Sequence, residues 1–153
     1  MSEEDAERIR QAYEVWNEAG PGAVTDQFWA EDAVYREVAL GERRPLGDAG
    51  AAGAAPREGP GWANAGVFRG RAAALARMQS LIDLVGPIEV HLDELIDVPD
   101  GRFVACTTMV GEGADAPYTQ SFAVVHRLRD GLIIEADYYL DQAQALQAVG
   151  LRE

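Results

Sequence analysis

The chain has little of what would place it in a membrane or in an oxidising compartment. Its 153 residues include one cysteine, Cys106, so no disulfide can form within the chain. No apolar run approaches the ~20 residues that a membrane-spanning helix needs. The first residues, Met1 to Asp5, are acidic and lack the basic and apolar regions of a signal peptide. We therefore expect a cytoplasmic protein that does not associate with membranes.

Positive charge and histidine are also scarce. The chain has 13 Lys and Arg against 26 Asp and Glu, a formal net charge of -13. Such a surface repels phosphate backbones, so we expect no nucleic-acid partner. Two distant histidines and a single cysteine do not make a zinc site, and the chain contains no Gly-Lys-Ser/Thr phosphate loop. We expect neither a metal nor another cofactor.

The length of the chain favours one domain spanning residues 1–153. A chain of this size buries roughly 70% of the surface that its unfolded form exposes, enough for a real core. Residues 41–66 stand apart, since 17 of these 26 residues are Gly, Ala or Pro. This composition cannot bury enough apolar surface to order itself. We interpret the segment as an insertion that is either mobile or a lid, with Trp62 as the candidate lid residue.

The N-terminal half predicts three helices and a strand. Residues 4–19 form an amphipathic pattern, which Gly20 ends and Pro21 follows with the start of a second helix. The second helix is expected to end near residues 31–32, before a strand over 33–39. A third helix is predicted over 71–85. One face of the first helix carries apolar residues at helical spacing: Ile9, Ala12, Tyr13 and Trp16.

The C-terminal half predicts strands over 88–98, 102–110, 117–128 and 132–140. Asp130-Gly131 is a strong hairpin signal, and Asp141 suits the N-cap of a final short helix. In the first of these strands we place the apolar residues on one face: Ile88, Val90, Leu92, Ile96 and Val98.

The strand over 102–110 is apolar on both faces. Its alternation assigns Val104, Cys106 and Thr108 to the inner face. The residues left for the outer face are Phe103, Ala105, Thr107 and Met109. Because that set is unusually apolar for a solvated surface, we expect a homodimer through the outer face of the sheet.

Five segments, in their order and spacing, resemble the SnoaL-like families of the NTF2-like superfamily. They are the opening helix, Trp29 to Tyr35, Phe68 to Arg71, Arg127 to Ile133 and Leu146 to Leu151. The resemblance implies an α+β cone-shaped barrel, with three N-terminal helices packed into a strongly curved, mostly antiparallel sheet and a short C-terminal helix. Members include ketosteroid isomerases and polyketide cyclases, so a pocket is implied but no single reaction.

Glu37 is the first candidate for catalysis. It lies on the strand after the second helix, on the same side as Tyr35. The resemblance places it at the position of the general base of ketosteroid isomerases. A carboxylate in an apolar pocket has a raised pKa and can carry protons near neutral pH. The alternative is a solvated glutamate paired with Arg36, Arg43 or Arg44.

Tyr13 and His126 are the other two candidates. The resemblance matches Tyr13 to the tyrosine that polarises the substrate oxygen in the isomerases. The alternative, which the sequence favours, is that Tyr13 packs in the core beside Trp16. His126 lies in the middle of a strand on the predicted inner face, where it could act as acid, base or hydrogen-bond donor. The alternative is a histidine that a neighbour merely satisfies.

Two functions remain open. The first is a cofactor-free isomerase or cyclase that moves a proton on an apolar, oxygen-bearing substrate such as a polyketide, steroid or terpenoid. The second is a non-catalytic binding or accessory protein for an apolar ligand. In both cases we expect the pocket to be lined by Trp16, Phe28, Tyr35, Met78, Thr108, Phe122, His126, Ala136 and Tyr138.

Overall fold

A computed structural model describes residues 2–38, 66–112 and 117–151. Most of the Gly/Ala/Pro-rich segment, including Trp62, lies outside the described residues. The described elements, in chain order, are α1 (Ser2–Ala19), α2 (Pro21–Phe28), β1 (Trp29–Glu37), β3 (Val67–Arg69), α5 (Arg71–Val85), β4 (Ile88–Asp97), β5 (Arg102–Gly111), β6 (Tyr118–Arg129), β7 (Leu132–Tyr139) and α6 (Gln142–Ala148).

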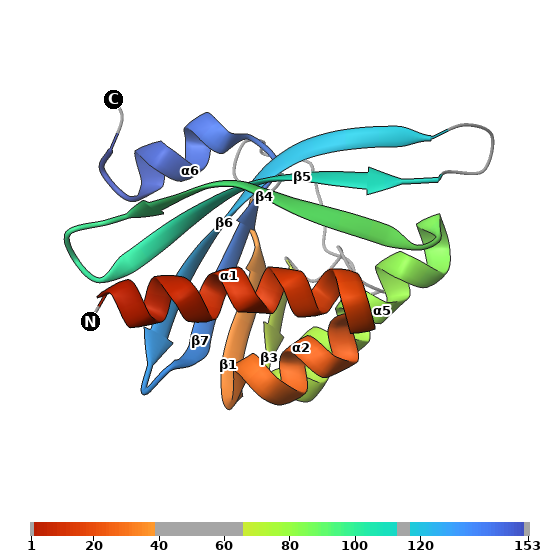
Figure 1. The fold of residues 1–153 in the computed structure, drawn as a ribbon, viewed down its shortest axis with the longest axis horizontal. Helices are drawn as coiled ribbons and strands as arrows, with labels where there is room; N and C mark the ends of the chain where they lie inside the picture. The colour runs from red at the N-terminus through yellow and green to blue at the C-terminus, as the bar shows by residue number, and fades with distance from the viewer. Residues whose placement is uncertain (1, 39–65, 113–116, 152–153) are drawn as a thin grey trace.

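The strands form one curved sheet in the order β3-β1-β7-β6-β5-β4. All neighbouring strands are antiparallel except β1 and β7, which are parallel. Helices α1, α2 and α5 lie on one side of the sheet, and α6 lies on the other (Figure 1). Among the described strands the sheet is open, with β3 and β4 at its edges. The predicted α+β class, with three N-terminal helices and a short C-terminal helix, is confirmed.

Local sequence signals place most of the boundaries. Asp130 and Gly131 both take positive φ, 55° and 79°, as a tight hairpin turn between β6 and β7 requires. The Asp141 carboxylate accepts a hydrogen bond from the backbone N–H of Ala143 at 2.9 Å and caps α6. One boundary differs from the prediction: α2 ends at Phe28, and β1 begins directly at Trp29.

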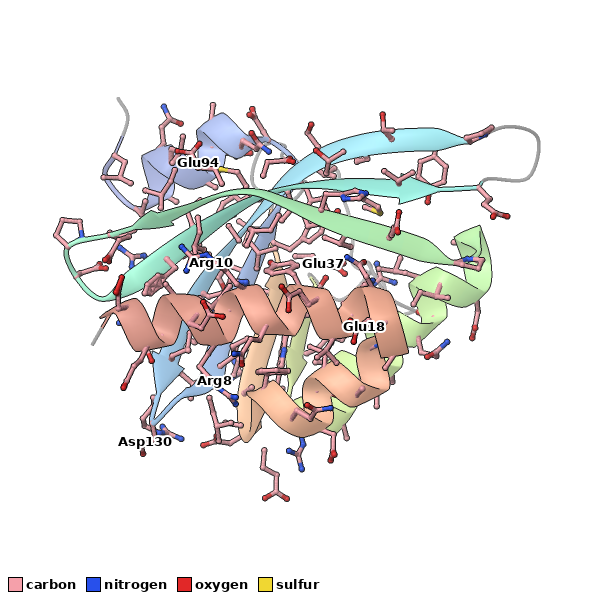
Figure 2. All side chains as sticks on the ribbon, in the orientation of Figure 1. Arg8, Arg10, Glu18, Glu37, Glu94 and Asp130 are labelled. Carbon is pink, nitrogen blue, oxygen red and sulfur yellow. The ribbon has the colours of Figure 1, made fainter. Side chains whose placement is uncertain are left out.

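Polar side chains fix α1 over the sheet. The Asn17 amide donates to the backbone oxygen of Val90 and accepts from its N–H, both at 2.8 Å. Next to it, the Trp16 indole N–H donates to the oxygen of Ile88 at 3.2 Å. At the other end of α1, Arg8 donates from Nε to the oxygen of Gly131 at 3.1 Å, beside Asp130 in the β6–β7 turn (Figure 2). The helix is thereby tied to both β4 and the turn.

The prediction for the faces of β5 is wrong. Phe103 pairs with His126, and Ala105 pairs with Val124. Directly paired residues share a face of the sheet, so Phe103 and Ala105 lie on the concave side with His126. Val104 and Cys106 instead pack on the opposite side, in a second core beneath α6. Both faces of β5 are buried, and alternation of apolar residues cannot distinguish two buried faces.

This correction removes the argument for a homodimer through that face. Phe103, Ala105 and Thr107 are fully buried within the chain itself, and Met109 packs against the main core. The homodimer therefore stays a prediction without that support.

A bulge in β4 produces a second difference. The register shifts between Leu92 and Glu94. Before the bulge, Val90 belongs to the main core on the concave side; after it, Ile96 and Val98 belong to the core beneath α6. The expectation that these residues share one face is wrong, because the extra residue reverses the alternation.

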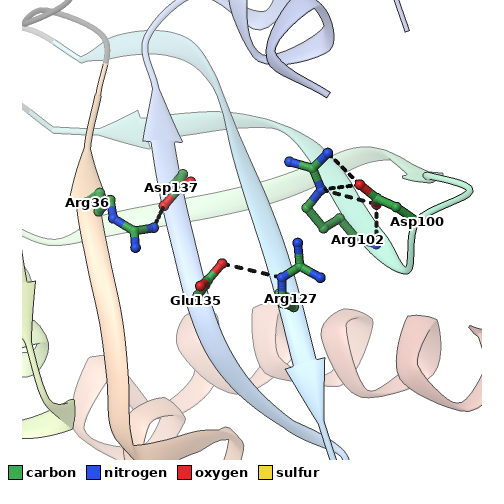
Figure 3. A network of polar contacts seen from close by, with 6 residues as sticks. All are labelled: Arg36, Asp100, Arg102, Arg127, Glu135 and Asp137. Atoms are coloured by element: carbon green, nitrogen blue, oxygen red, sulfur yellow. Dashed lines mark hydrogen bonds and ion pairs between the residues drawn. The ribbon is translucent and has the colours of Figure 1, made fainter. Parts of the chain in front are cut away.

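The far side of the sheet is charged where α6 does not cover it. Arg36 of β1 pairs with Asp137 of β7 at 2.7 Å, and Arg127 of β6 pairs with Glu135 of β7 at 3.4 Å (Figure 3). These side chains alternate along their strands with residues of the concave side. The sheet therefore has a polar outer face and an apolar inner face at β1, β7 and β6.

Candidate functional site

A cavity of about 130 Å³ lies between the concave face of the sheet and helices α1, α2 and α5. Its wall is almost wholly apolar. Aliphatic residues and methionines come from the three helices and from β4 to β7. Six aromatic residues complete the wall together with His126: Tyr13, Trp16, Trp29, Tyr35, Phe122 and Tyr138.

Most of the predicted pocket residues line this cavity. The structure brings together Trp16, Tyr35, Met78, Phe122, His126, Ala136 and Tyr138, and adds the candidate catalytic residue Tyr13. Sequence reasoning missed Trp29, because it was placed in a helix, and Met109, because β5 was assigned the wrong face. The alternation of β5, read with the opposite parity, would have found Met109.

Two predicted residues lie away from the cavity. Phe28 is buried at the end of α2, where the Arg8 guanidinium lies 4.4 Å from its ring centroid. Thr108 faces the other side of β5, and its hydroxyl donates to the Asp93 carboxylate at 2.6 Å. Its displacement follows from the reversed faces of β5. The expected role of Trp62 concerns a residue outside the described part of the chain.

Tyr13 and His126 form a polar pair in the apolar wall. The Tyr13 hydroxyl, from α1, lies 3.0 Å from Nε2 of His126, from the middle of β6. The two rings meet edge to face, with centroids 6.0 Å apart. Although 113 positions separate them in the chain, the packing of α1 across the sheet brings them into contact. The sequence predicted each residue separately but not their hydrogen bond.

Burial controls the protonation of this pair. Desolvation lowers the pKa of His126 to about 4, so the imidazole is neutral near pH 7. Desolvation, with a smaller contribution from Cys106, raises the pKa of Tyr13, so the phenol keeps its proton. The pair therefore carries two polar hydrogens, one on oxygen and one on the ring, at neutral pH.

One of these two hydrogens has no acceptor. His126 Nδ1 is buried and has no hydrogen-bond partner among the described residues. If Nδ1 carries the ring proton, that N–H stays unsatisfied while Tyr13 donates to Nε2. If Nε2 carries it, the ring donates to Tyr13, and the Tyr13 hydroxyl is free to donate into the cavity. An unsatisfied buried group costs about 1–3 kcal/mol, so an acceptor in the cavity would favour the second tautomer.

Glu37 lies beside the cavity and outside its described wall. Its carboxylate accepts two hydrogen bonds from Arg77 of α5, at 2.7 Å from Nε to Oε2 and 3.0 Å from Nη2 to Oε1. The Tyr35 hydroxyl also donates to Oε2, at 3.3 Å. Both side chains are largely buried, with 18% and 14% of Glu37 and Arg77 exposed. The Tyr35 hydroxyl therefore connects Glu37 to the cavity wall.

The partner of Glu37 is not one of the arginines that the sequence suggested. Arg36 pairs with Asp137 on the outer face, and Arg43 and Arg44 lie outside the described residues. Arg77 stands 40 positions later, and nothing in the sequence links it to β1. Glu37 is thus ion-paired, as the alternative expected, but it is largely buried rather than solvated, and its partner comes from α5.

Gly66 lets the chain pass closely beside Glu37. Its backbone oxygen accepts from the Glu37 N–H at 2.8 Å, and its φ is +62°. A Cβ at this position would lie 2.9 Å from both the Cβ and the backbone oxygen of Glu37. Glycine therefore satisfies a backbone conformation and a close approach at once.

The two tyrosines near Glu37 stay protonated. Burial, followed by the charge of Glu37, raises the pKa of Tyr138 to about 12. The same two causes, in the same order, raise the pKa of Tyr35. Tyr138 also stacks on Phe122, with ring centroids 4.8 Å apart. At neutral pH both phenols are therefore neutral hydrogen-bond donors.

Within the described residues, no three His, Cys, Asp or Glu side chains come together in a way that could hold a metal ion. The helices of the described part also include none that is long and apolar enough to cross a bilayer.

Solved structures with the same fold place this architecture among known proteins. Bal32a, from a soil-derived mobile gene cassette, is 18% identical in sequence and has a TM-score of 0.65. The superposition covers 90% of this chain and 88% of the Bal32a chain. A protein with a ketosteroid isomerase-like fold from Catenulispora acidiphila, solved with trimethylamine, is 16% identical, with coverage of 95% and 93% and a TM-score of 0.63. A Jannaschia protein whose name places it with the SnoaL-like polyketide cyclases is 12% identical, with coverage of 98% and 94% and a TM-score of 0.63. At these identities the likeness establishes the fold alone.

Sequence comparisons are more specific about the family. A comparison with curated proteins found no match. The family model of the SnoaL-like domain, however, matches residues 9–136. This range includes α1 from Ile9 onward, the described strands except the end of β7, and every described residue that lines the cavity apart from Tyr138. The chain therefore belongs to the SnoaL-like family, whose fold is shared by cyclases and isomerases.

Proposed function

We propose that this protein binds an apolar, oxygen-bearing small molecule in the cavity and activates it by cofactor-free acid–base chemistry of the isomerase or cyclase type. The observation that carries the proposal is the Tyr13–His126 pair in the wall of an apolar cavity, where His126 Nδ1 has no partner among the described residues. With the ring proton on Nε2, the Tyr13 hydroxyl is free to donate into the cavity. A ligand carbonyl or hydroxyl oxygen supplies the missing acceptor.

The pair acts on the ligand through Tyr13. With Nε2 of His126 as donor, the phenol oxygen accepts one hydrogen bond and its own hydrogen points to the ligand. A donor in a dry cavity stabilises negative charge that develops on a carbonyl oxygen, as enolisation or ring closure requires. His126 is a weak base in this setting, since its pKa is about 4. Its role is to orient and polarise Tyr13.

Glu37 is the proposed proton acceptor. Because Glu37 does not line the cavity, a proton from the ligand would reach its carboxylate by one of two routes. It would pass through the Tyr35 hydroxyl, or it would be taken up directly after the ion pair between Glu37 and Arg77 opens. In this scheme Glu37→Gln abolishes turnover and leaves ligand affinity nearly unchanged. Turnover by that variant at the wild-type rate would remove Glu37 from the mechanism.

A second function has its own support. Arg77 occupies both oxygens of Glu37, so the described wall of the cavity offers no free carboxylate to act as base. A non-catalytic binding or accessory protein needs only the cavity and the donor. This alternative predicts ligand binding with no conversion, in the wild type and in Glu37→Gln alike.

The test uses a panel of neutral cyclic ketones and phenols. Binding is measured by calorimetry and by quenching of tryptophan fluorescence, since Trp16 and Trp29 line the cavity. Mass spectrometry detects conversion. Tyr13→Phe keeps the ring and removes the donor, so affinity should fall by about five- to tenfold.

Tyr118→Phe is the matched control, because Tyr118 lies over Gly111 at the far end of β6 and does not line the cavity. It should bind as the wild type does. The proposal fails if no compound of the panel binds, or if Tyr13→Phe binds every ligand as tightly as the wild type.

A further inference from the structure

The size of the cavity limits its ligand. At about 130 Å³ it is slightly smaller than an engineered apolar cavity of about 150 Å³ that holds one benzene molecule. We propose that the ligand of this site is a neutral compound with a single six-membered ring, such as a cyclic enone or a substituted phenol, whose oxygen accepts from Tyr13. This inference rests on the proposed function and narrows the ligand within the range of polyketides, steroids and terpenoids considered from the sequence.

The cavity owes its volume to a small residue in the sheet, on the side of the cavity that we call its floor. Three strands place Tyr35, Ala136 and His126 side by side in one row of the sheet. Ala136 is the small residue of that row, and its position between two rings leaves the space above it open. In the next row, Tyr138 of β7 pairs with Val124 of β6, and the Tyr138 ring stacks on Phe122 in the cavity wall.

The wall also selects against charge. Among the described residues that line the cavity, the titratable ones are three tyrosines, which keep their protons, and one neutral histidine. The nearby Glu37 and Arg77 satisfy each other. A charged ligand would lose its hydration without gaining a counter-charge, which is strongly unfavourable. The aromatic side chains around the space suit a flat, neutral ring.

A size series on the full chain tests the limit. Calorimetry would compare 4-methylphenol and cyclohex-2-enone with the two-ring compounds 2-naphthol and 1-tetralone, and with a four-ring steroid ketone. We expect each two-ring compound to bind about tenfold more weakly than its one-ring counterpart, or worse, and the steroid not to bind. Benzoate and benzylammonium should both bind more weakly than the neutral benzyl alcohol.

The outcomes separate this inference from the proposed function. A two-ring compound or a steroid that binds as tightly as 4-methylphenol overturns the size limit and leaves the proposed function standing. Tight binding of either ion overturns the requirement for neutrality in the same way. Absence of binding throughout the series overturns both.

Variants of the wall give a second test. Ala136→Val fills the floor and should weaken 4-methylphenol by about tenfold or more. Met78→Ala removes most of a side chain that α5 contributes to the wall and so enlarges the cavity. The ratio of the affinity for 2-naphthol to that for 4-methylphenol should rise by a similar factor. Leu84→Ala, on the same helix with 79% of Leu84 exposed, is the matched control and should leave the ratio unchanged.

Met109→Ala enlarges the cavity from β5 and replaces Met78→Ala if that variant does not fold. An unchanged ratio of affinities in a folded enlarged variant would contradict the inference.

Discussion

Two polar pairs lie close to one cavity, and they differ in nearly every physical respect. Tyr13 and His126 are neutral, are held by one hydrogen bond and keep one donor unused. Glu37 and Arg77 are charged, are held by two hydrogen bonds and satisfy each other. The first pair lines the cavity, whereas the second lies behind Tyr35.

Glu37, the residue that the family resemblance associates with the general base, is less available for reaction than Tyr13 or His126. Glu37 occupies the position that the resemblance associates with proton transfer, but its carboxylate is engaged by an arginine from α5. The unsatisfied hydrogen-bonding group belongs instead to the pair of Tyr13 and His126, which the sequence indicates only as two separate candidates. Availability for chemistry depends on unsatisfied hydrogen bonding, which only the packed structure reveals.

The largest expected effect comes from breaking the charged pair. Arg77→Met leaves the Glu37 carboxylate largely buried without its cation, which should lower the free energy of unfolding by about 3 kcal/mol in urea denaturation. The double variant with Glu37→Gln should recover much of that loss, because no charge is then left unpaired.

The exposed pair Arg127–Glu135 supplies the matched control, with 39% and 38% of its side chains exposed. Arg127→Met should cost less than about 1 kcal/mol. Equal losses for the two arginine variants would mean that the Glu37–Arg77 pair behaves as an ordinary surface pair.

A slightly smaller effect comes from acid and concerns the neutral pair. An unfolded histidine takes up a proton near pH 6.5, whereas folded His126 does so near pH 4. Between these values the unfolded chain binds more protons, so stability falls as the pH is lowered. The contribution of His126 is fully present above pH 6.5, and about 3 kcal/mol of it is lost once the pH has fallen to 4.

The measurement is the difference in unfolding free energy between the wild type and His126→Asn from pH 7 to pH 4. The difference removes the titration of the carboxylates, which both proteins share. His91→Asn, which removes an exposed imidazole, is the matched control. Parallel pH profiles for the wild type and His126→Asn would contradict the burial of a neutral imidazole.

The smallest effect tests the link between the two pairs. Tyr35→Phe removes the 3.3 Å hydrogen bond to Glu37 and keeps the ring in the cavity wall. We expect a loss of about 0.5 kcal/mol in unfolding free energy. Ligand affinity should stay near that of the wild type, while turnover should fall if protons pass through Tyr35. A loss of affinity as large as that of Tyr13→Phe would show that Tyr35 contacts the ligand oxygen itself.

The sequence was most informative where a signal is local. The amphipathic pattern of α1, the Asp130-Gly131 turn and the Asp141 cap each depend on neighbouring residues, and the structure confirms all three. The inner face of β6 was predicted from the alternation of Phe122, Val124 and His126, and the structure places all three side chains in the cavity wall.

Prediction failed where local pattern is ambiguous or the contact is distant. Apolar residues on both faces of β5 hid its orientation, and the bulge in β4 reversed an alternation that looked continuous. The Tyr13–His126 and Glu37–Arg77 contacts join elements 113 and 40 positions apart. No spacing rule connects such residues, so the chemistry of the site depends on tertiary packing.

The Asn17 amide has a consequence for solubility. β4 is an edge strand, and an edge strand offers unpaired backbone groups to which a strand of another molecule can add. By copying the hydrogen bonds of a peptide group at Val90, this single side chain occupies a place where an invading strand would join. Detachment of α1 would uncover that position, so the contact that holds α1 on the sheet also blocks the addition of another strand there.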